Sequence, residues 1–260
     1  LHHHDTIFAL FLFISGMTFP FSLEKKRSKG LSDKSITLDV IRRGLTLFFL
    51  GLVYEGFFQF HFESLRIPSV LGKIGLAWML AAILYCHTGK KAQWGVAAGI
   101  LIGYFLLLKL VVAPDAPAGA DSLSKEGNIA FYIDRLLLPD NIYKPGVYDP
   151  EGILSTIPAV VTAMLGMFTG RYVKESPATG ERKTLNMLAA AIVMAIVAVV
   201  WAHWFPVIKK LWTSTFVLAC GAWSIGLFAV FYYLIDVKGW RKGTVFFQVV
   251  GMNSITIYMA

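Results

Sequence analysis

Long apolar runs separated by short polar segments dominate this chain of 260 residues. Each run continues for about 16 to 24 residues, the length that a helix needs to cross a hydrocarbon core of roughly 30 Å. A helix on the surface of a soluble protein would instead show polar residues every few positions. The pattern therefore predicts an all-α, polytopic integral membrane protein, a helical bundle with about eight transmembrane helices. The expected spans are 6–23, 38–59, 69–87, 93–112, 153–171, 185–205, 212–235 and 245–260.

The composition agrees with a membrane protein. Only 15% of the residues are charged, against roughly 25% in soluble domains. The net charge of +8 is distributed in short clusters between the apolar runs, where charges set topology and contact lipid headgroups. We therefore expect membrane lipids as partners, and no nucleic acid. Cys86 and Cys220 lack the spacing of metal ligands, so no metal site is expected.

Positive charges are unequally distributed over the connecting segments. When the segment 24–43 is placed in the cytoplasm and the spans alternate, sixteen of the 24 lysines and arginines fall on the inner side. The positive-inside rule favours this orientation. It places Leu1 and the long connection 113–152 outside. The loops expected in the cytoplasm are 24–43, 88–92, 172–184 and 236–243.

The connection 113–152 differs from the other loops. It is rich in proline and glycine and holds seven of the 16 acidic residues, Glu151 being the last of them. A loop of this length is usually functional or disordered. Its segment 131–139 is apolar enough to pack or to form a short helix. We expect an ordered outer cap over a site.

Polar groups at membrane depth are costly, so each needs a reason. Asp5 opens the first span, either as a carboxylate that favours the helix dipole or as a group that acts in an outer cavity. Lys73 lies about one turn inside the third span, where it either snorkels outward or lines a polar cavity. Asn253 falls in the middle of the last span and needs a partner there, either another helix or a ligand.

Two further sets of charges stand at span ends. Arg42 and Arg43 mark the inner start of the second span. They are either a cytoplasmic anchor paired with Asp39 at helical spacing or a cationic pair for an anionic ligand, because the arginine fork suits phosphate. Asp149 and Glu151 precede the fifth span, where acids are often only helix caps.

Several segments, spread over nearly the whole chain, carry a resemblance. They are Asp5-Thr6-Ile7-Phe8 leading into FLFISG (11–16), IRRGL (41–45), RIPSVLGKIG (66–75), YIDRLLL (132–138), YDPEGILSTIPAVVTAMLG (148–166), FPVIKKLWTSTFVL (205–218), DVKGW (236–240) and GMNSITIY (251–258). In this order they resemble the transmembrane acyltransferases related to heparan-α-glucosaminide N-acetyltransferase, including bacterial homologues. We expect one transmembrane acyltransferase domain over 1–260, incomplete at both ends.

The resemblance implies an activity and a location. The family takes an acetyl group from cytoplasmic acetyl-CoA, a co-substrate, and passes it to an amino sugar or glycan on the periplasmic or lumenal side. For this chain it suggests the bacterial inner membrane and a homodimer. The family's catalytic histidine would lie upstream of Leu1, and Asp5 matches the acidic partner that orients it. The amine attacks the thioester either directly in a ternary complex or through an acetyl-histidine.

The resemblance also suggests roles for the polar residues. The side chains expected near the acetyl-CoA path are Arg42, Arg43, Arg66 and Lys73. An outer location of Arg66 and Lys73 would serve the sugar instead. Asn253 is a candidate for polarising the thioester carbonyl, and Asp149 and Glu151 are the expected contacts of the acceptor.

Alternative functions remain open at this point. An O-acyltransferase of envelope glycans would use the same donor. A secondary transporter would carry its substrate without chemistry, and such proteins often show paired repeats, which this sequence lacks. A non-catalytic membrane scaffold is a third class.

Overall fold

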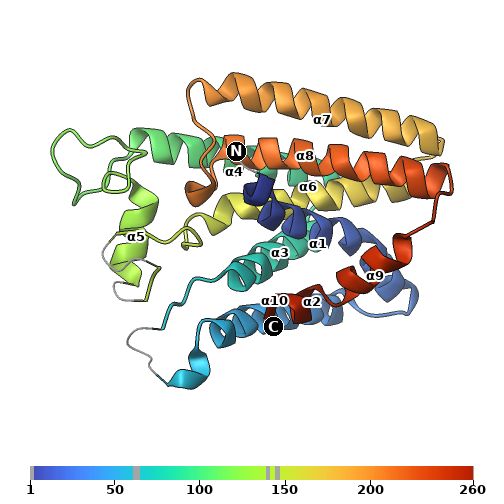
Figure 1. The fold of residues 1–260 in the computed structure, drawn as a ribbon, viewed down its shortest axis with the longest axis horizontal. Helices are drawn as coiled ribbons and strands as arrows, with labels where there is room; N and C mark the ends of the chain where they lie inside the picture. Colours follow the sequence, from blue (N-terminus) through green and yellow to red (C-terminus); the bar gives the residue numbers. More distant parts are fainter. Residues whose placement is uncertain (1–2, 61–64, 139–140, 144–146, 260) are drawn as a thin grey trace.

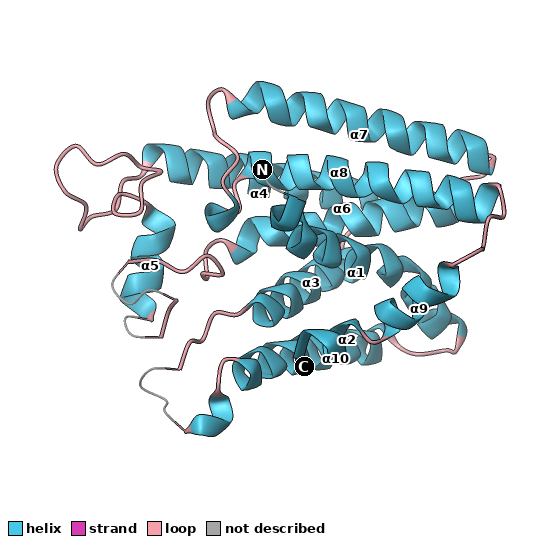
Figure 2. Ribbon diagram, in the orientation of Figure 1, coloured by secondary structure: helices cyan, strands magenta, loops and turns pink. Residues whose placement is uncertain are grey.

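The computed structural model describes residues 3–60, 65–138, 141–143 and 147–259. In these residues helices are the regular elements, and no strand is formed (Figures 1 and 2). The expectation of an all-α chain is confirmed. The α-helices are α1 His3–Ser28, α2 Asp33–Tyr54, α3 Val70–His87, α4 Lys90–Leu110, α5 Ile129–Leu137, α6 Thr156–Glu175, α7 Gly180–Ala202, α8 Ser214–Tyr232, α9 Thr244–Met252 and α10 Ser254–Met259. The described residues also form two short 3-10 helices, η1 Phe57–Gln59 and η2 Lys209–Leu211, and one π-helix, η3 Tyr233–Val237.

Five helices in the described residues are long and apolar enough to cross a membrane. They are α1 from Asp5, α3, α4, α7, and α8 continued by η3 to Val237. The expected number of about eight spans is therefore too high by this criterion. The expected spans that do not qualify correspond to α2, α6 and the pair α9 and α10.

These exceptions have different physical causes. Helix α2 carries charged side chains within its length, Arg42 and Arg43 among them. Helix α6 is buried at every residue from Pro158 to Arg171, so its surface meets protein and does not need the strongly apolar composition of a lipid-facing helix. The expected span 245–260 is interrupted at Asn253, which separates the nine residues of α9 from the six of α10.

Helix α6 is the centre of the bundle and packs against α1, α3 and α8. Small residues let α1 approach it closely. A Cβ added at Gly166 would clash with the carbonyl oxygen of Phe13, and one at Gly170 with that of Met17. Close packing through small residues is typical of helix pairs in membranes. It fixes the position of α1, whose first turn carries Asp5.

A second, smaller core lies at one end of the bundle, around α5 (left in Figure 1). The ring of Phe131 packs on that of Tyr148, with 5.3 Å between the centroids. The hydroxyl of Tyr104 donates to the carbonyl oxygen of Leu211 at 2.6 Å. Most of the apolar segment 131–139 thus forms a short helix, α5, which packs on the end of α4, while residue 139 lies outside the described residues.

Candidate functional site

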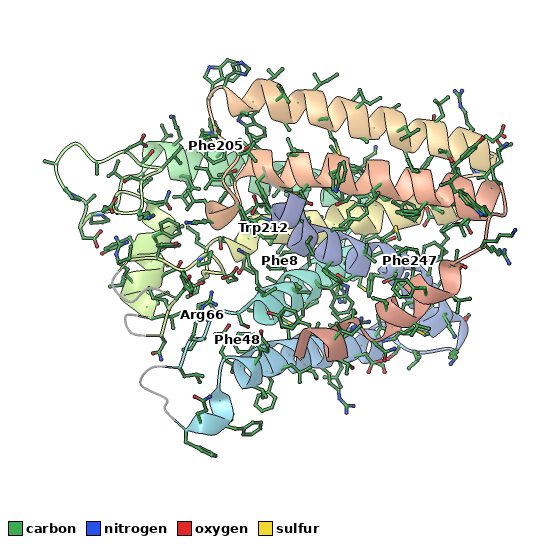
Figure 3. The ribbon with its side chains drawn as sticks, in the orientation of Figure 1. Phe8, Phe48, Arg66, Phe205, Trp212 and Phe247 are labelled. Carbon is green, nitrogen blue, oxygen red and sulfur yellow. The ribbon has the colours of Figure 1, made fainter. Side chains whose placement is uncertain are left out.

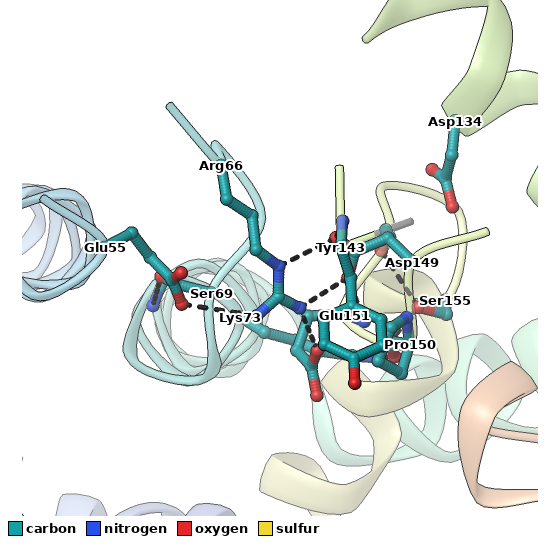
Figure 4. Close-up of polar contacts among 12 residues, drawn as sticks. Glu55, Arg66, Ser69, Lys73, Asp134, Tyr143, Asp149, Pro150, Glu151 and Ser155 are labelled. Atoms are coloured by element: carbon teal, nitrogen blue, oxygen red, sulfur yellow. Dashed lines mark hydrogen bonds and ion pairs between the residues drawn. The ribbon is translucent and has the colours of Figure 1, made fainter. Parts of the chain in front are cut away.

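A network of buried charges joins the start of α3 to the loop before α6 (Figure 4). The Arg66 guanidinium donates to both carboxylate oxygens of Asp149, at 2.9 Å from Nε and 2.7 Å from Nη2. It also donates to Glu55 at 3.2 Å and to Glu151. Such a fork-to-carboxylate pair is among the stronger ion pairs in proteins. Arg66 therefore holds the end of α2 and the loop 147–155 together.

Asp149 is the best-satisfied carboxylate of this network. It is fully buried and accepts two backbone N–H groups, from Tyr143 at 2.7 Å and from Glu151 at 2.8 Å. With the two bonds from Arg66, its oxygens are engaged by the protein itself. Glu151, the other residue predicted to contact the acceptor, keeps 10% of its side chain exposed.

Lys73 is buried and does not snorkel outward; it is only 2% exposed. Its ammonium donates to the hydroxyl of Ser155 at 2.8 Å and to the carbonyl oxygen of Pro150 at 3.2 Å. It also lies 4.5 Å from the centroid of the Trp212 ring, a favourable cation–π contact. Of the two expectations for Lys73, the structure supports a polar environment inside the bundle.

Burial changes the acidity of the carboxyls outside the membrane-spanning helices. It raises the pKa of Asp134 to about 7, although the N–H of Ile153 donates to this carboxyl at 2.8 Å. Burial also raises the pKa of Glu151, against the lowering effect of Lys73 and Arg66. Asp134 and Glu151 therefore hold their protons more tightly than free carboxyl groups do. We call Glu55, Arg66, Lys73, Asp134, Asp149 and Glu151 together the outer cluster.

Asp5 contacts the segment between α7 and α8. Lys209 donates to its carboxylate at 3.3 Å, and both side chains are partly exposed. The neighbouring Lys210 donates to the hydroxyl of Tyr148 at 3.1 Å. The KKLW sequence of this segment therefore connects α1 to the loop 147–155.

Trp212 ends that segment and occupies the centre of the bundle (Figure 3). It is buried and has a φ of +51°, a backbone conformation that is uncommon for residues other than glycine. Its indole donates to Thr162 at 3.2 Å, and its ring contacts Phe8 edge-on, with 4.8 Å between centroids. Because Lys73 lies over the same ring, Trp212 connects the outer cluster to the first helix.

A cavity of about 370 Å³ lies between α1, α2, α3 and α10. We call it the α1–α3 cavity. Its polar contributions come from Ser15, Arg43, Ser254 and Tyr258, and apolar side chains line the rest. Because the lining includes Ile7 and Phe8, the cavity reaches the turn of α1 that follows Asp5.

Arg42 and Arg43 face different sides of α2. Arg43 lines the α1–α3 cavity and lies 4.8 Å from the centroid of the Trp78 ring. Arg42 lines a separate, shallow depression on the outer surface of α2, because neighbouring residues on a helix point in different directions. The expected pairing of Asp39 with these arginines is not formed, since Asp39 pairs with Lys26 at 3.0 Å, and the choice between a cytoplasmic anchor and a ligand contact stays a prediction.

Asn253 is exposed and lies at the break between α9 and α10. Its amide donates to the carbonyl oxygen of Val249 at 2.8 Å, so it is a helix-terminating residue here and not one in the middle of a span. The next residue, Ser254, lines the α1–α3 cavity. Asn253 is therefore close in sequence to the cavity, while its own amide is engaged by the backbone.

The structure brings four of the predicted site residues together and leaves the other four, Asp5, Arg42, Arg43 and Asn253, outside that group. Arg66, Lys73, Asp149 and Glu151 meet in the outer cluster, although they come from two distant segments. Sequence reasoning missed four partners, namely Glu55, Asp134, Lys209 and Trp212. Their spacing gives no periodic signal, and only the folded chain brings them together. Within the described residues, no group of three or more His, Cys, Asp or Glu side chains is placed to hold a metal ion.

These features are those of a helical integral membrane protein with a cavity, open beside Ile7 and Phe11, close to a largely buried charge network. No family model matches the chain. It is similar to heparan-alpha-glucosaminide N-acetyltransferase from Homo sapiens, with 27% identity over 98% of this chain and 46% of the relative. The same enzyme from Mus musculus is 26% identical over 98% of this chain and 47% of the relative. The chain is thus related to these N-acetyltransferases, as the sequence segments indicate, and spans about half the length of the curated relatives it matches.

Proposed function

We propose that this chain forms part of a transmembrane acetyltransferase that moves an acetyl group from cytoplasmic acetyl-CoA to an amino sugar on the opposite side. The observation that carries the proposal is the similarity to two proteins named N-acetyltransferases, which extends over 98% of the chain. The α1–α3 cavity supports it, because it provides room for a ligand between helices that carry Asp5 and Arg43.

In this proposal α2 and α6 also cross the membrane. They have 22 and 20 residues, or about 33 and 30 Å at 1.5 Å per residue, which matches a hydrocarbon core. With these two crossings, the chain alternates between the two ends of the bundle from α1 to α8 (Figure 1). The basic loops then face the cytoplasm, as expected in the bacterial inner membrane, and α5 with the outer cluster faces the other side.

The donor would enter from the basic inner side. Arg43 lines the α1–α3 cavity, where its guanidinium is suited to a phosphate of acetyl-CoA. The apolar walls of the cavity suit the slender pantetheine arm, which would carry the thioester toward the first turn of α1. Arg42 would add only surface charge in this arrangement.

The reaction itself needs a base and an orienting group. The nitrogen of the acceptor amine attacks the thioester carbonyl carbon, the carbon–sulfur bond breaks, and the sulfur leaves with the bonding electrons as coenzyme A thiolate. The amine proton passes to a general base. Asp5 is proposed to orient this base, and Lys209 to position Asp5 by the contact described above. Glu151 is proposed to hold the acceptor's ammonium group before it loses its proton.

The proposal is tested with full-length protein in lipid nanodiscs. We expect release of free coenzyme A thiol from acetyl-CoA only when glucosamine is present, together with transfer of labelled acetyl to the sugar nitrogen. A matched preparation with glucose in place of glucosamine controls for thioester hydrolysis. Thiol release that does not depend on the amine, or no turnover at all, would remove the acetyltransferase assignment.

A further inference from the structure

A second hollow lies along α3, outside the α1–α3 cavity. It has a volume of about 520 Å³. Its walls are formed by α3 together with residues of α2 on one side and of α6 on the other. Phe48, Leu76 and Met79 are among its apolar walls. Leu80 and Ile157, which also line it, are 44% and 43% exposed. This α3 groove is therefore open at the side of the bundle, where hydrocarbon from a bilayer can reach it.

One end of the α3 groove is charged. Lys73 and Glu151 line the groove there, and both belong to the outer cluster. An apolar groove on a membrane protein that ends in buried charges has the two-part chemistry of a lipid, with a hydrocarbon chain and a polar head.

A second groove of the bundle has the same volume but no charged end. The hollow between α7 and α8 has the same volume of about 520 Å³ and is lined by Ala195, Val199 and Trp223 among other residues. No Asp, Glu, Lys or Arg lines it. This α7–α8 groove is suited to bulk lipid chains alone and serves as an internal comparison.

The sign of the charge selects the head group. Besides Asp134, whose pKa is raised to about 7, the outer cluster has the three carboxyl groups that Arg66 binds and two cations, Arg66 and Lys73, so acidic groups exceed cations by one. Both cations are already engaged by protein oxygens, as described above. A head group with an ammonium therefore complements this end of the groove better than a neutral or an anionic one.

We propose that the α3 groove holds the hydrocarbon chain of a glycolipid whose amino-sugar head lies against Glu151. The acceptor then arrives laterally from the outer leaflet and not from the aqueous phase. This inference rests on the proposed function for the identity of the head group, whereas binding of an amine-headed lipid does not depend on catalysis.

Binding is tested by photo-crosslinking in phosphatidylcholine nanodiscs. The probe is a glucosaminyl diacylglycerol with a diazirine in one acyl chain, and the control lipid is the glucosyl diacylglycerol, which has the same chains without the amine. We expect about tenfold more label from the amino lipid than from the control on peptides containing Leu80 and Ile157, since loss of a charged hydrogen bond costs about a factor of ten. The peptide containing Ala195 should label equally with both lipids. Equal labelling of the α3 groove by the two lipids would show an adventitious lipid shell only and overturn the proposal.

A variant pair then tests the use of the groove. Ile157→Trp fills the α3 groove, and Ala195→Trp places the same side chain in the α7–α8 groove. The measured quantity is the ratio of acetyl transfer to glucosaminyl diacylglycerol over transfer to soluble glucosamine. We expect Ile157→Trp to lower this ratio about tenfold and Ala195→Trp to leave it unchanged.

The outcomes separate the two proposals. A ratio that Ile157→Trp does not change, while wild-type protein acetylates both acceptors, overturns the groove proposal and leaves the acetyltransferase. Absence of transfer to either acceptor overturns the acetyltransferase, and the crosslinking comparison still decides whether the groove binds an amine-headed lipid.

Discussion

The outer cluster and the α1–α3 cavity are neighbours in the bundle but are built in opposite ways. In the outer cluster the protein satisfies its own charges, since Arg66 binds three carboxylates and Asp149 is fully buried. The cavity is mostly apolar, with a few polar groups such as Arg43 and Ser254 on its walls. A saturated network fixes a loop in place, whereas an open cavity leaves room for a ligand. Changes at Arg66 and Asp149 should therefore mainly alter stability, and changes in the cavity should mainly alter binding and catalysis.

Trp212 contacts a residue of each region. Its ring has Lys73 at 4.5 Å and the edge of Phe8 at a centroid distance of 4.8 Å. Phe8 lines the α1–α3 cavity. A single buried side chain thus contacts both the ammonium of Lys73 and a ring that lines the cavity, so it couples the position of the charge network to the shape of the cavity.

The largest expected effect is on stability, from Arg66→Ala. Removing the guanidinium leaves Glu55, Asp149 and Glu151 close together without their cation, and breaking such a buried pair costs about 3–5 kcal/mol. We expect a clear drop in the midpoint of thermal unfolding in detergent. Arg27→Ala is the matched control, because the pair of Arg27 with Asp33 is exposed on both sides and contributes at most about 1 kcal/mol. Equal effects of the two variants would show that the outer cluster is not a stabilising network.

The second prediction concerns the pH dependence of that stability. The pKa of Asp134 is raised from 3.8 to about 7 in the folded protein, so the folded state binds its proton more tightly than the unfolded state does. Stability from this group is present below pH 3.8, falls as the pH rises through the window to about 7, and is constant above it. The total loss is up to about 4 kcal/mol, because each pH unit contributes about 1.4 kcal/mol.

Asp134→Asn isolates this contribution. The amide oxygen can still accept the N–H of Ile153, but the group no longer ionises. We therefore expect the unfolding midpoint of the variant to exceed that of the wild type increasingly from pH 4 to about 7. Asp115→Asn, which removes a carboxyl that is 48% exposed, should keep the wild-type profile. Parallel profiles for wild type and Asp134→Asn would contradict the burial of this carboxyl.

The third prediction concerns the catalytic roles of Asp5 and Lys209. Asp5→Asn removes the charge proposed to orient the base, so we expect acetyl transfer to fall about 100-fold while the unfolding midpoint stays close to that of the wild type. Lys209→Met should give a smaller loss in rate and a shifted pH–rate profile, as a positioning residue would. Asp33→Asn controls for the loss of an exposed carboxylate at another helix start. Wild-type turnover in Asp5→Asn would remove Asp5 from the site.

The sequence predicts some parts of this molecule better than others. The apolar runs locate α1, α3, α4, α7 and α8, because lipid-facing helices must be apolar along their whole length. They overcount at α9 and α10, since apolar composition does not reveal the break at Asn253. They also do not show that α6 is enclosed by other helices, because burial in protein and burial in lipid favour similar residues.

The candidate site, like the helices, could be predicted from the sequence only in part. Arg66, Lys73, Asp149 and Glu151 could be singled out because charged groups near spans are costly. Their mutual contacts could not be predicted, since Arg66 and Asp149 are 83 positions apart. The different directions of Arg42 and Arg43 do follow from helix geometry, but which of them faces the cavity depends on how α2 packs on α3.

The smallest expected effect is also the sharpest test of the cavity, because Arg42 and Arg43 are adjacent and carry the same charge. Arg43→Ala should weaken binding of coenzyme A to protein in nanodiscs about tenfold, the loss expected for one charge-assisted contact to phosphate. Arg42→Ala removes an equal charge from the opposite side of α2 and should change affinity by no more than about twofold, the effect of a screened surface charge. Titration calorimetry at two salt concentrations separates the two, since only the surface effect should vanish at high salt. If both variants lose affinity equally, the donor does not enter the α1–α3 cavity, and the basic inner surface alone attracts it.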